Sequence, residues 1–312
     1  MKITKNIFMA FTVALIIFTY SIIALTIIIS RNSFSIIALS DTQYYAENNP
    51  EIFCSLTDWI IANRERINII FVSHLGDIVQ NGGKMISEWK MASRCLSKLD
   101  NVVPYSTIPG NHDYDIVNNP TSGLKSYNTN FYKKFLQYGW YKGHYKGNAN
   151  NYQVIKINNE TEVVFLNLEP EPTDDTLKWA EGIVKNNTDK FIFITTHIYL
   201  LDYADKRTSS HIFRPHGNTG EDIWNKLVKN NCNIKLVLSG HFCTDKNGDN
   251  VLKSKNMCGE YVSQITQDYQ ERDSQKSGLL RIYMFYPQIK RIISYTYSVV
   301  TKKINLTSFM IL

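Results

Sequence analysis

The 312-residue sequence lacks several features that would place it in a specialised class of protein. It has no Pro/Gly-rich linker and no internal repeat, so a single large domain is the simplest organisation. Its 34 basic and 28 acidic residues give a formal net charge of +6, but no block of basic residues stands out. No nucleic-acid partner is expected, because nucleic-acid-binding domains gather their positive charge into a patch or stripe.

The cysteines are few and form no recognisable motif. There are five of them, an odd number, and no two are spaced as C-x-x-C. This count predicts neither a disulfide framework nor a four-cysteine zinc site. It leaves the compartment of the protein open.

The N-terminal region lacks charge over a long stretch. Residues 7–29 carry no charged side chain, and 23 mostly apolar positions are enough to cross the hydrocarbon core of a bilayer as a helix. No small-x-small cleavage site precedes Arg31, so a retained signal anchor is preferred over a cleaved signal, which would give a secreted protein. Lys2 and Lys5 favour a cytoplasmic N-terminus and a domain on the extracytoplasmic side. A buried core helix is the remaining alternative for this segment.

These observations divide the chain into five parts. A short cytoplasmic segment (1–6) precedes the single-pass transmembrane signal anchor (7–29), a linker (30–34), one globular domain (35–300) and a C-terminal tail (301–312). The membrane is therefore a predicted partner, through the N-terminal helix.

Strand-like and helix-like patterns alternate along the domain. Short apolar, β-branched runs predict buried strands, and amphipathic stretches predict helices. The predicted strands cover residues 35–39, 68–72, 103–108, 162–168, 190–196 and 234–239, and the predicted helices cover 51–65, 84–99, 173–186 and 220–230. Such alternation is typical of an α/β domain. Three later runs (261–269, 279–286 and 291–298) have no helix between them and are expected to form a meander that completes a second sheet.

Polar side chains follow five of the six predicted strands. They are Asp41 and Gln43 after the first strand, Asp77 after the second, Asn111, His112 and Asp113 after the third, His197 after the fifth and His241 after the sixth. One such residue is usually part of a turn or a solvated loop. Because ligands bind at the carboxyl ends of strands in open α/β sheets, five strand ends that all present Asp, Asn or His favour a shared site.

These side chains fit metal chemistry. Carboxylates, imidazoles and neutral amides are ligands for cations such as Mn²⁺, Fe and Zn²⁺. A carboxylate can bridge two ions, which then act together on the attacking and leaving oxygens of an in-line displacement. His112 beside Asp113 adds a proton donor with a carboxylate to orient it.

The ordered set D-x-Q, GD, GNHD, H and GH resembles the calcineurin-like metallophosphoesterase family from about residue 35 to 241. DTQYY at 41–45, and DYQ at 268–270 followed by GLLRIYMFYP, resemble one bacterial-type branch and extend the likeness to about residue 298. The resemblance implies a four-layer α/β/β/α sandwich of two mixed sheets. It also implies two metal ions, Mn, Fe or Zn, as cofactors.

The resemblance implies a role for each of these residues. The implied metal ligands are Asp41 and Gln43 for a first ion, Asp77 as the bridge, and Asn111, His197 and His241 for a second ion. His112 would stabilise or protonate the leaving oxygen, with Asp113 behind it as the second catalytic residue.

Two positions depart from the family pattern, in which D-x-H and G-H-x-H are usual. Gln43 stands at the first and can ligate through its carbonyl oxygen. Cys243 stands at the second; it would ligate as a thiolate, or be oxidised or paired, for example with Cys258. Asp245 is the substitute ligand nearby, and without either residue the first metal site would be weak.

Two further residues are candidates for contact with the substrate. Asn81 follows Asp77 by four positions, and Arg214 lies in a polar loop before the helix at 220, where a guanidinium can clamp a phosphate. A solvated loop is the structural alternative for Arg214.

The predicted function is hydrolysis of a phosphomonoester or phosphodiester by in-line attack of a metal-bound hydroxide. The substrate would be a small-molecule, lipid or envelope phosphate ester. The alternative is a catalytically weak or inactive domain that serves as a membrane-tethered phosphate-binding or scaffold module. His112 and Asp113 together favour the enzyme, because a binding module needs no proton donor.

Overall fold

The structure of the protein, a computed structural model, describes residue 19 and residues 33–158, 161–242, 248–270 and 276–311. Among these residues, no helix is long and apolar enough to cross a membrane. The predicted anchor (7–29), apart from Thr19, and the segment 1–6 lie outside the described residues.

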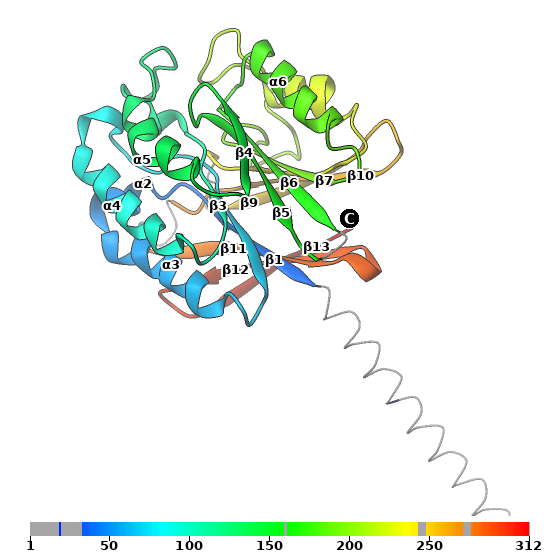
Figure 1. The fold of residues 1–312 in the computed structure, drawn as a ribbon, viewed down its shortest axis with the longest axis horizontal. Coiled ribbons are helices and arrows are strands. Elements are labelled where there is room, and N and C mark those ends of the chain that lie inside the picture. Colours follow the sequence, from blue (N-terminus) through cyan, green and yellow to red (C-terminus); the bar gives the residue numbers. More distant parts are fainter. Residues whose placement is uncertain (1–18, 20–32, 159–160, 243–247, 271–275, 312) are drawn as a thin grey trace, which may run out of the picture.

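Two mixed β-sheets form the centre of the domain (Figure 1). In the described part of the chain, the first sheet has the order β13 (Ile304–Ile311), β12 (Arg291–Ser298), β11 (Leu279–Tyr286), β1 (Phe34–Leu39), β2 (Ile69–His74) and β3 (Tyr105–Ser106). The second has the order β4 (Tyr141–Tyr145), β5 (Asn150–Lys156), β6 (Glu162–Leu168), β7 (Phe191–Thr196), β8 (Ile234–Ser239), β10 (Tyr261–Gln267) and β9 (Asp249–Lys255). The strands β1, β2 and β3 run parallel, as do β6, β7, β8 and β10.

Helices cover the outer face of each sheet (Figure 1). The first sheet is covered by α2 (Gln43–Asn48), α3 (Pro50–Asn63), α4 (Ile86–Leu96) and α5 (Lys125–Phe135), and the second by α6 (Asp174–Lys185) and α7 (Gly220–Ile223), which continues as a π-helical turn over Trp224–Val228. A third apolar core lies between the sheets, where the rings of Phe71 and Phe165 stack with their centroids 3.7 Å apart. Three apolar cores between four layers confirm the α/β class and the two mixed sheets.

The predicted strands and helices have counterparts at the same places, but the C-terminal third is arranged differently. The expected meander is divided, because β10 pairs with β8 in the second sheet while β11 and β12 belong to the first. The segment expected as a tail (301–312) contains β13, which pairs with β12. The sequence pattern of consecutive strands does not show between which two strands the chain passes from one sheet to the other.

Four of the five cysteines form disulfides. Cys54 of α3 is bonded to Cys95 of α4, and Cys232 is bonded to Cys258. The prediction of no disulfide framework is therefore wrong. An odd number of cysteines excludes complete pairing, but it does not exclude pairs that leave one residue over.

The carboxyl ends of β1, β2, β7 and β8 lie at one end of the sandwich. The loops that follow them carry Asp41, Asp77, His197 and His241, so residues distant in the chain meet at this end.

Candidate metal centre

Three of the predicted ligands occupy left-handed backbone conformations. Asp41, Asp77 and His241 have φ values of 45°, 51° and 72°. Such values are uncommon for residues other than glycine, and they persist where the surrounding structure imposes them, often at functional sites. At each of these positions the chain turns sharply just after a strand, which points the side chain back over the end of the sheet.

Two glycines allow the loops to approach one another closely. A Cβ atom at Gly110 would collide with the carboxylate of Asp77, and one at Gly240 would collide with the carboxylate of Asp41. Both carboxylates are therefore packed directly against backbone, where any other residue would displace them.

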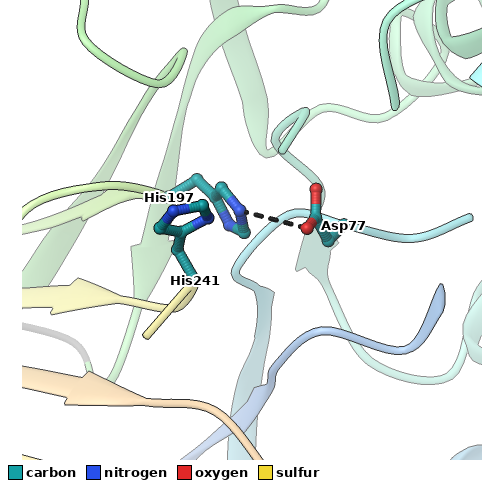
Figure 2. A group of neighbouring side chains, drawn as sticks. All are labelled: Asp77, His197 and His241. Atoms are coloured by element: carbon teal, nitrogen blue, oxygen red, sulfur yellow. Dashed lines mark ion pairs between the residues drawn. The ribbon is translucent and has the colours of Figure 1, made fainter. Parts of the chain in front are cut away.

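Asp77, His197 and His241 form a cluster of metal-ligating side chains (Figure 2). One ligand atom from each lies within 4.8 Å of the others, a spacing that one cation can fill. The Nε2 atom of His197 is 3.4 Å from Oδ2 of Asp77, and the centroids of the His197 and His241 rings are 5.1 Å apart. Burial, followed by the nearby His197, lowers the pKa of His241 to about 4, so this imidazole is neutral and able to ligate at neutral pH.

The ring of His197 is oriented by a backbone carbonyl. Its Nδ1 atom lies 2.8 Å from the carbonyl oxygen of Leu75, which can only accept, so Nδ1 carries the proton. In the neutral ring, Nε2 then directs a lone pair at Oδ1 of Asn111, 3.1 Å away, and at Oδ2 of Asp77. Three electron-rich atoms facing one another require a proton or a cation between them. Burial acts to lower the pKa of His197, but the charge and hydrogen bond of Asp77 outweigh it and raise the pKa.

Gln43 presents an acceptor that has no partner. Its Nε2 donates to Oδ2 of Asp77, at 3.3 Å, and to Oε1 of Gln270, while its own Oε1 is buried without a hydrogen bond. Burying an unsatisfied oxygen is costly, and a cation would satisfy it. Asp41 lies in the same group, where its carboxylate accepts the backbone N–H of His241 at 3.2 Å. The predicted ligands present among the described residues therefore fit a metal centre.

His112 is held at the edge of this cluster by two contacts. Its backbone N–H donates to Oδ1 of Asp77 at 2.9 Å, and its ring Nδ1 lies 2.9 Å from the carbonyl oxygen of Gln80. The carbonyl fixes the proton on Nδ1 and leaves Nε2 as the atom that can exchange a proton.

The carboxylate of Asp113, which the family resemblance implied to lie behind His112, is hydrogen-bonded to backbone N–H groups of two loops. Its carboxylate accepts backbone N–H groups of Ile78 (2.9 Å), Val79 (3.0 Å) and Gly110 (2.8 Å) and is fully buried. Burial and the charge of Asp77 raise the pKa of Asp113, and the N–H donors oppose that shift. These bonds tie the loop after β2 to the loop that carries His112, so Asp113 fixes the relative position of Asp77 and His112.

The two residues predicted to contact the substrate are each hydrogen-bonded to acidic side chains in the structure. Asn81 donates from Nδ2 to Glu88 at 2.6 Å and to Glu47 at 3.3 Å. Arg214 donates from Nη2 to Glu169 at 2.8 Å and to the hydroxyl of Tyr114 at 2.7 Å.

Cys243, the other uncertain ligand, and Asp245 lie outside the described residues. The partner suggested for Cys243, Cys258, is bonded to Cys232.

Two acidic residues at the same end of the sandwich were missed in the sequence. Glu169 and Glu171 follow the fourth predicted strand, the one strand end to which no polar residue was assigned. Glu171 is buried and accepts the backbone N–H groups of Ile212, Phe213 and Arg214, which fastens their loop beside the site. The stretch LEPE could have revealed them. It places acidic residues directly after a buried strand, and the same pattern identified the candidate ligands after the other strands.

Comparison with known proteins agrees with this geometry. A family model described as calcineurin-like phosphoesterase matches residues 34–245. The uncharacterised protein YvnB of Bacillus subtilis (strain 168) is 31% identical over 287 residues, which are 88% of this chain. The match covers 21% of YvnB, so this chain spans about a fifth of the length of that relative.

Two solved structures share the fold. A dimetal phosphatase from Danio rerio superposes with a TM-score of 0.55 at 13% identity, covering 88% of this chain and 99% of that one. GAP50 of Plasmodium, described as the anchor in the inner membrane complex, gives a TM-score of 0.50 at 11% identity and covers 90% of this chain and 88% of its own.

Proposed function

The chain belongs to the calcineurin-like phosphoesterase family, and from that premise we propose that it hydrolyses a phosphomonoester or phosphodiester at the cluster of Asp77, His197 and His241. Membership makes it a metal-dependent hydrolase of phosphate esters in general. The observation that carries the proposal is the meeting of Nε2 of His197, Oδ1 of Asn111 and Oδ2 of Asp77, with the unsatisfied Oε1 of Gln43 nearby.

We propose that the described ligands serve two ions. Asp41 and Gln43 would hold one ion, Asn111, His197 and His241 would hold the other, and Asp77 would serve both. Ions held by these residues would activate a water as the nucleophile and would neutralise charge on the phosphate oxygens. The protein keeps the ligands in place through the carbonyl of Leu75, the backbone N–H of His112 and the side chain of Gln270.

His112 is the proposed proton donor to the leaving oxygen. Its Nδ1 is hydrogen-bonded to the carbonyl of Gln80, so the proton to be transferred is the one on Nε2. The anchoring of its backbone to Asp77 keeps the ring at a fixed position relative to the metal ligands.

We place the domain on the extracytoplasmic side of a membrane, anchored by residues 7–29. Two observations support this location. The segment 7–29 is long and uncharged, and disulfides such as Cys54–Cys95 and Cys232–Cys258 persist in oxidising compartments. The substrate would then be a phosphate ester of the cell envelope or its surroundings, and no nucleic acid is expected as a partner.

Membrane fractionation of the full chain with an alkaline wash tests the anchoring, and release by the wash would contradict it.

Hydrolysis of an aryl phosphomonoester and an aryl phosphodiester by the full chain tests the activity. With added Mn²⁺ we expect the unmodified chain to turn over the ester. The rate should fall at least 10²-fold in Asp77→Asn, because the Asp77 carboxylate is the ligand proposed to serve both ions. Asp189→Asn is the matched control, since Asp189 has a side chain that is 74% exposed and should leave the rate unchanged. Equal rates in Asp77→Asn and the unmodified chain would overturn the assignment of the site.

A further inference from the structure

An apolar groove of about 630 Å³ opens between the two sheets at the end of the sandwich opposite the metal ligands. It is lined by Phe34 at the start of β1, by Phe191 and Phe193 at the start of β7, and by Phe285 near the end of the antiparallel strand β11. The same strands β1 and β7 carry Asp41 and His197 just beyond their carboxyl ends. The groove and the proposed active site are thus separated by the length of the strands.

The floor of the groove is a rigid stack of aromatic rings. Phe285 stacks against Phe34 at 4.8 Å and against Phe193 at 5.1 Å, and all three are buried. The rim is different, because Phe191 and Tyr261 are each 44% exposed and Ile289, next to the lining residues Gln288 and Lys290, is 46% exposed. Large apolar side chains gathered around an apolar groove mark an interaction surface.

Lysine side chains stand beside the aromatic rings at the rim. Lys235 and Lys290 line the groove together with one acidic residue, Glu260, and the ammonium group of Lys235 is ion-paired with the carboxylate of Glu260. Lys290 adds one positive charge to this neutral pair. The ammonium group of Lys235 also lies 5.7 Å from the ring of Phe191, so the stem of this lysine packs beside an exposed aromatic ring. Aromatic rings combined with lysine stems are the side chains that settle at the boundary between lipid headgroups and acyl chains.

The chain itself brings this groove close to the predicted anchor. The uncharged segment ends at Ile29 and β1 begins at Phe34, so five residue steps separate them. Fully extended, that connection reaches about 17 Å, while the headgroup layer on one side of a bilayer is roughly 5–8 Å thick. Phe34, and with it the groove, must therefore lie at or near the headgroups if residues 7–29 span the membrane.

We propose that this groove is the membrane-facing surface of the domain, which inserts Phe191, Tyr261 and Ile289 into the interfacial layer of the bilayer from which the chain emerges. The inference rests on the proposed anchoring and adds an orientation to it. A strand of six residues such as β1 is about 20 Å long, so the metal ligands at its other end face away from the bilayer. The enzyme would then act on esters at a distance from its own membrane rather than on the headgroups beneath it.

Photolabelling of the full chain in anionic phospholipid vesicles tests the proposal. The vesicles contain a phospholipid whose photoreactive group sits at the headgroup end of an acyl chain, and labelled residues are located by mass spectrometry. We expect labels on Phe191, Tyr261 and the stretch 287–290, in addition to the segment 7–29. The double variant Phe191→Ser with Tyr261→Ser should lower labelling of 287–290 at least five-fold and leave hydrolysis of a soluble ester unchanged.

Ile116→Ser is the matched control, because Ile116 is 62% exposed in the loop that follows His112 and should not affect labelling. Labels confined to 7–29, or labels at Ile116, would overturn the proposed surface and leave the anchoring intact. Absence of labels from 7–29 together with release in the alkaline wash would overturn both. Hydrolysis of the soluble ester reports separately on the phosphoesterase, so its failure is distinguishable from either result.

Discussion

Gln270 accepts a hydrogen bond from the side-chain amide of Gln43, although 227 positions separate the two residues in the chain. Gln270 is held in turn by Asp268, which accepts its Nε2 proton at 2.9 Å and its backbone N–H at 2.9 Å. The stretch DYQ thus positions Gln43, a predicted metal ligand whose acceptor atom Oε1 is buried without a hydrogen bond. The role of Gln270 is to orient Gln43.

Removal of the Gln270 side chain should weaken metal binding. In Gln270→Ala we expect the affinity for Mn²⁺ to fall 10- to 100-fold, the usual cost of losing a residue that orients a ligand. Titration calorimetry measures this directly, and activity should recover at saturating Mn²⁺. Gln288→Ala, an exposed glutamine at the opposite end of the domain, is the control. A drop in activity that excess Mn²⁺ does not restore would show that Gln270 acts in some other way.

Loss of the Asp113 carboxylate should lower stability as well as activity. Asp113→Ala leaves buried N–H groups of Ile78, Val79 and Gly110 without an acceptor, so we expect the free energy of unfolding to fall by about 3–5 kcal/mol. Urea denaturation followed by fluorescence provides the measurement. Asp189→Ala, at an exposed position, should change the free energy by less than about 0.5 kcal/mol. An unfolding curve of Asp113→Ala identical to that of the unmodified chain would restore the role first predicted for Asp113, orientation of His112.

Chelation of metal should destabilise the folded protein. A ligand present at one hundred times its dissociation constant stabilises the native state by about 2.7 kcal/mol, so removing it with EDTA should lower Tm by several degrees. Differential scanning calorimetry with and without Mn²⁺ measures the shift. In Asp77→Asn the two scans should coincide, because this substitution removes the carboxylate shared by the two proposed ion sites. A shift of equal size in the variant would place the ion at other residues.

Opening the Cys54–Cys95 bond should also destabilise the domain. The two cysteines are 41 positions apart, and a loop of that length predicts a loss of about 2–4 kcal/mol in the double variant Cys54→Ala with Cys95→Ala. Chemical denaturation under non-reducing conditions tests this value. A reducing agent should lower the stability of the unmodified chain further than that of the variant, since the Cys232–Cys258 bond is then the only described disulfide left to reduce in the variant. Equal effects of reduction on both proteins would show that the first bond contributes nothing.

The strand ends were the most predictable part of the site. The periodicity and composition of apolar residues locate buried strands, and a parallel arrangement brings the carboxyl ends of these strands together. Asp41, Asp77, His197 and His241 could therefore be grouped from the amino-acid sequence alone. The partner of a side chain is harder to predict. Asp113 is adjacent to His112 in sequence, yet its carboxylate turns toward backbone N–H groups, because a fully buried carboxylate needs several donors.

Sheet membership and disulfide pairing depend on contacts between distant parts of the chain. Nothing in residues 261–298 indicates that β10 joins one sheet and β11 the other, since both are short apolar runs. The pairing of Cys54 with Cys95 requires that α3 and α4 pack side by side, which a pattern within either helix does not reveal. The backbone partners of Glu171 could not be predicted for the same reason, because they lie some forty residues further on in the chain.

The central place of β1 in its sheet has a consequence for the order in which the protein folds. On one side β1 pairs with β2, which follows it closely, but on the other it pairs with β11, where Phe34 meets Phe285 and Ala38 meets Arg281. At a synthesis rate of about 5–20 residues per second, β11 emerges tens of seconds after β1. Throughout that interval one edge of β1 remains open to pairing with other chains. The native sheet can close only after β11 has been synthesised, so folding of the domain is expected to be slow.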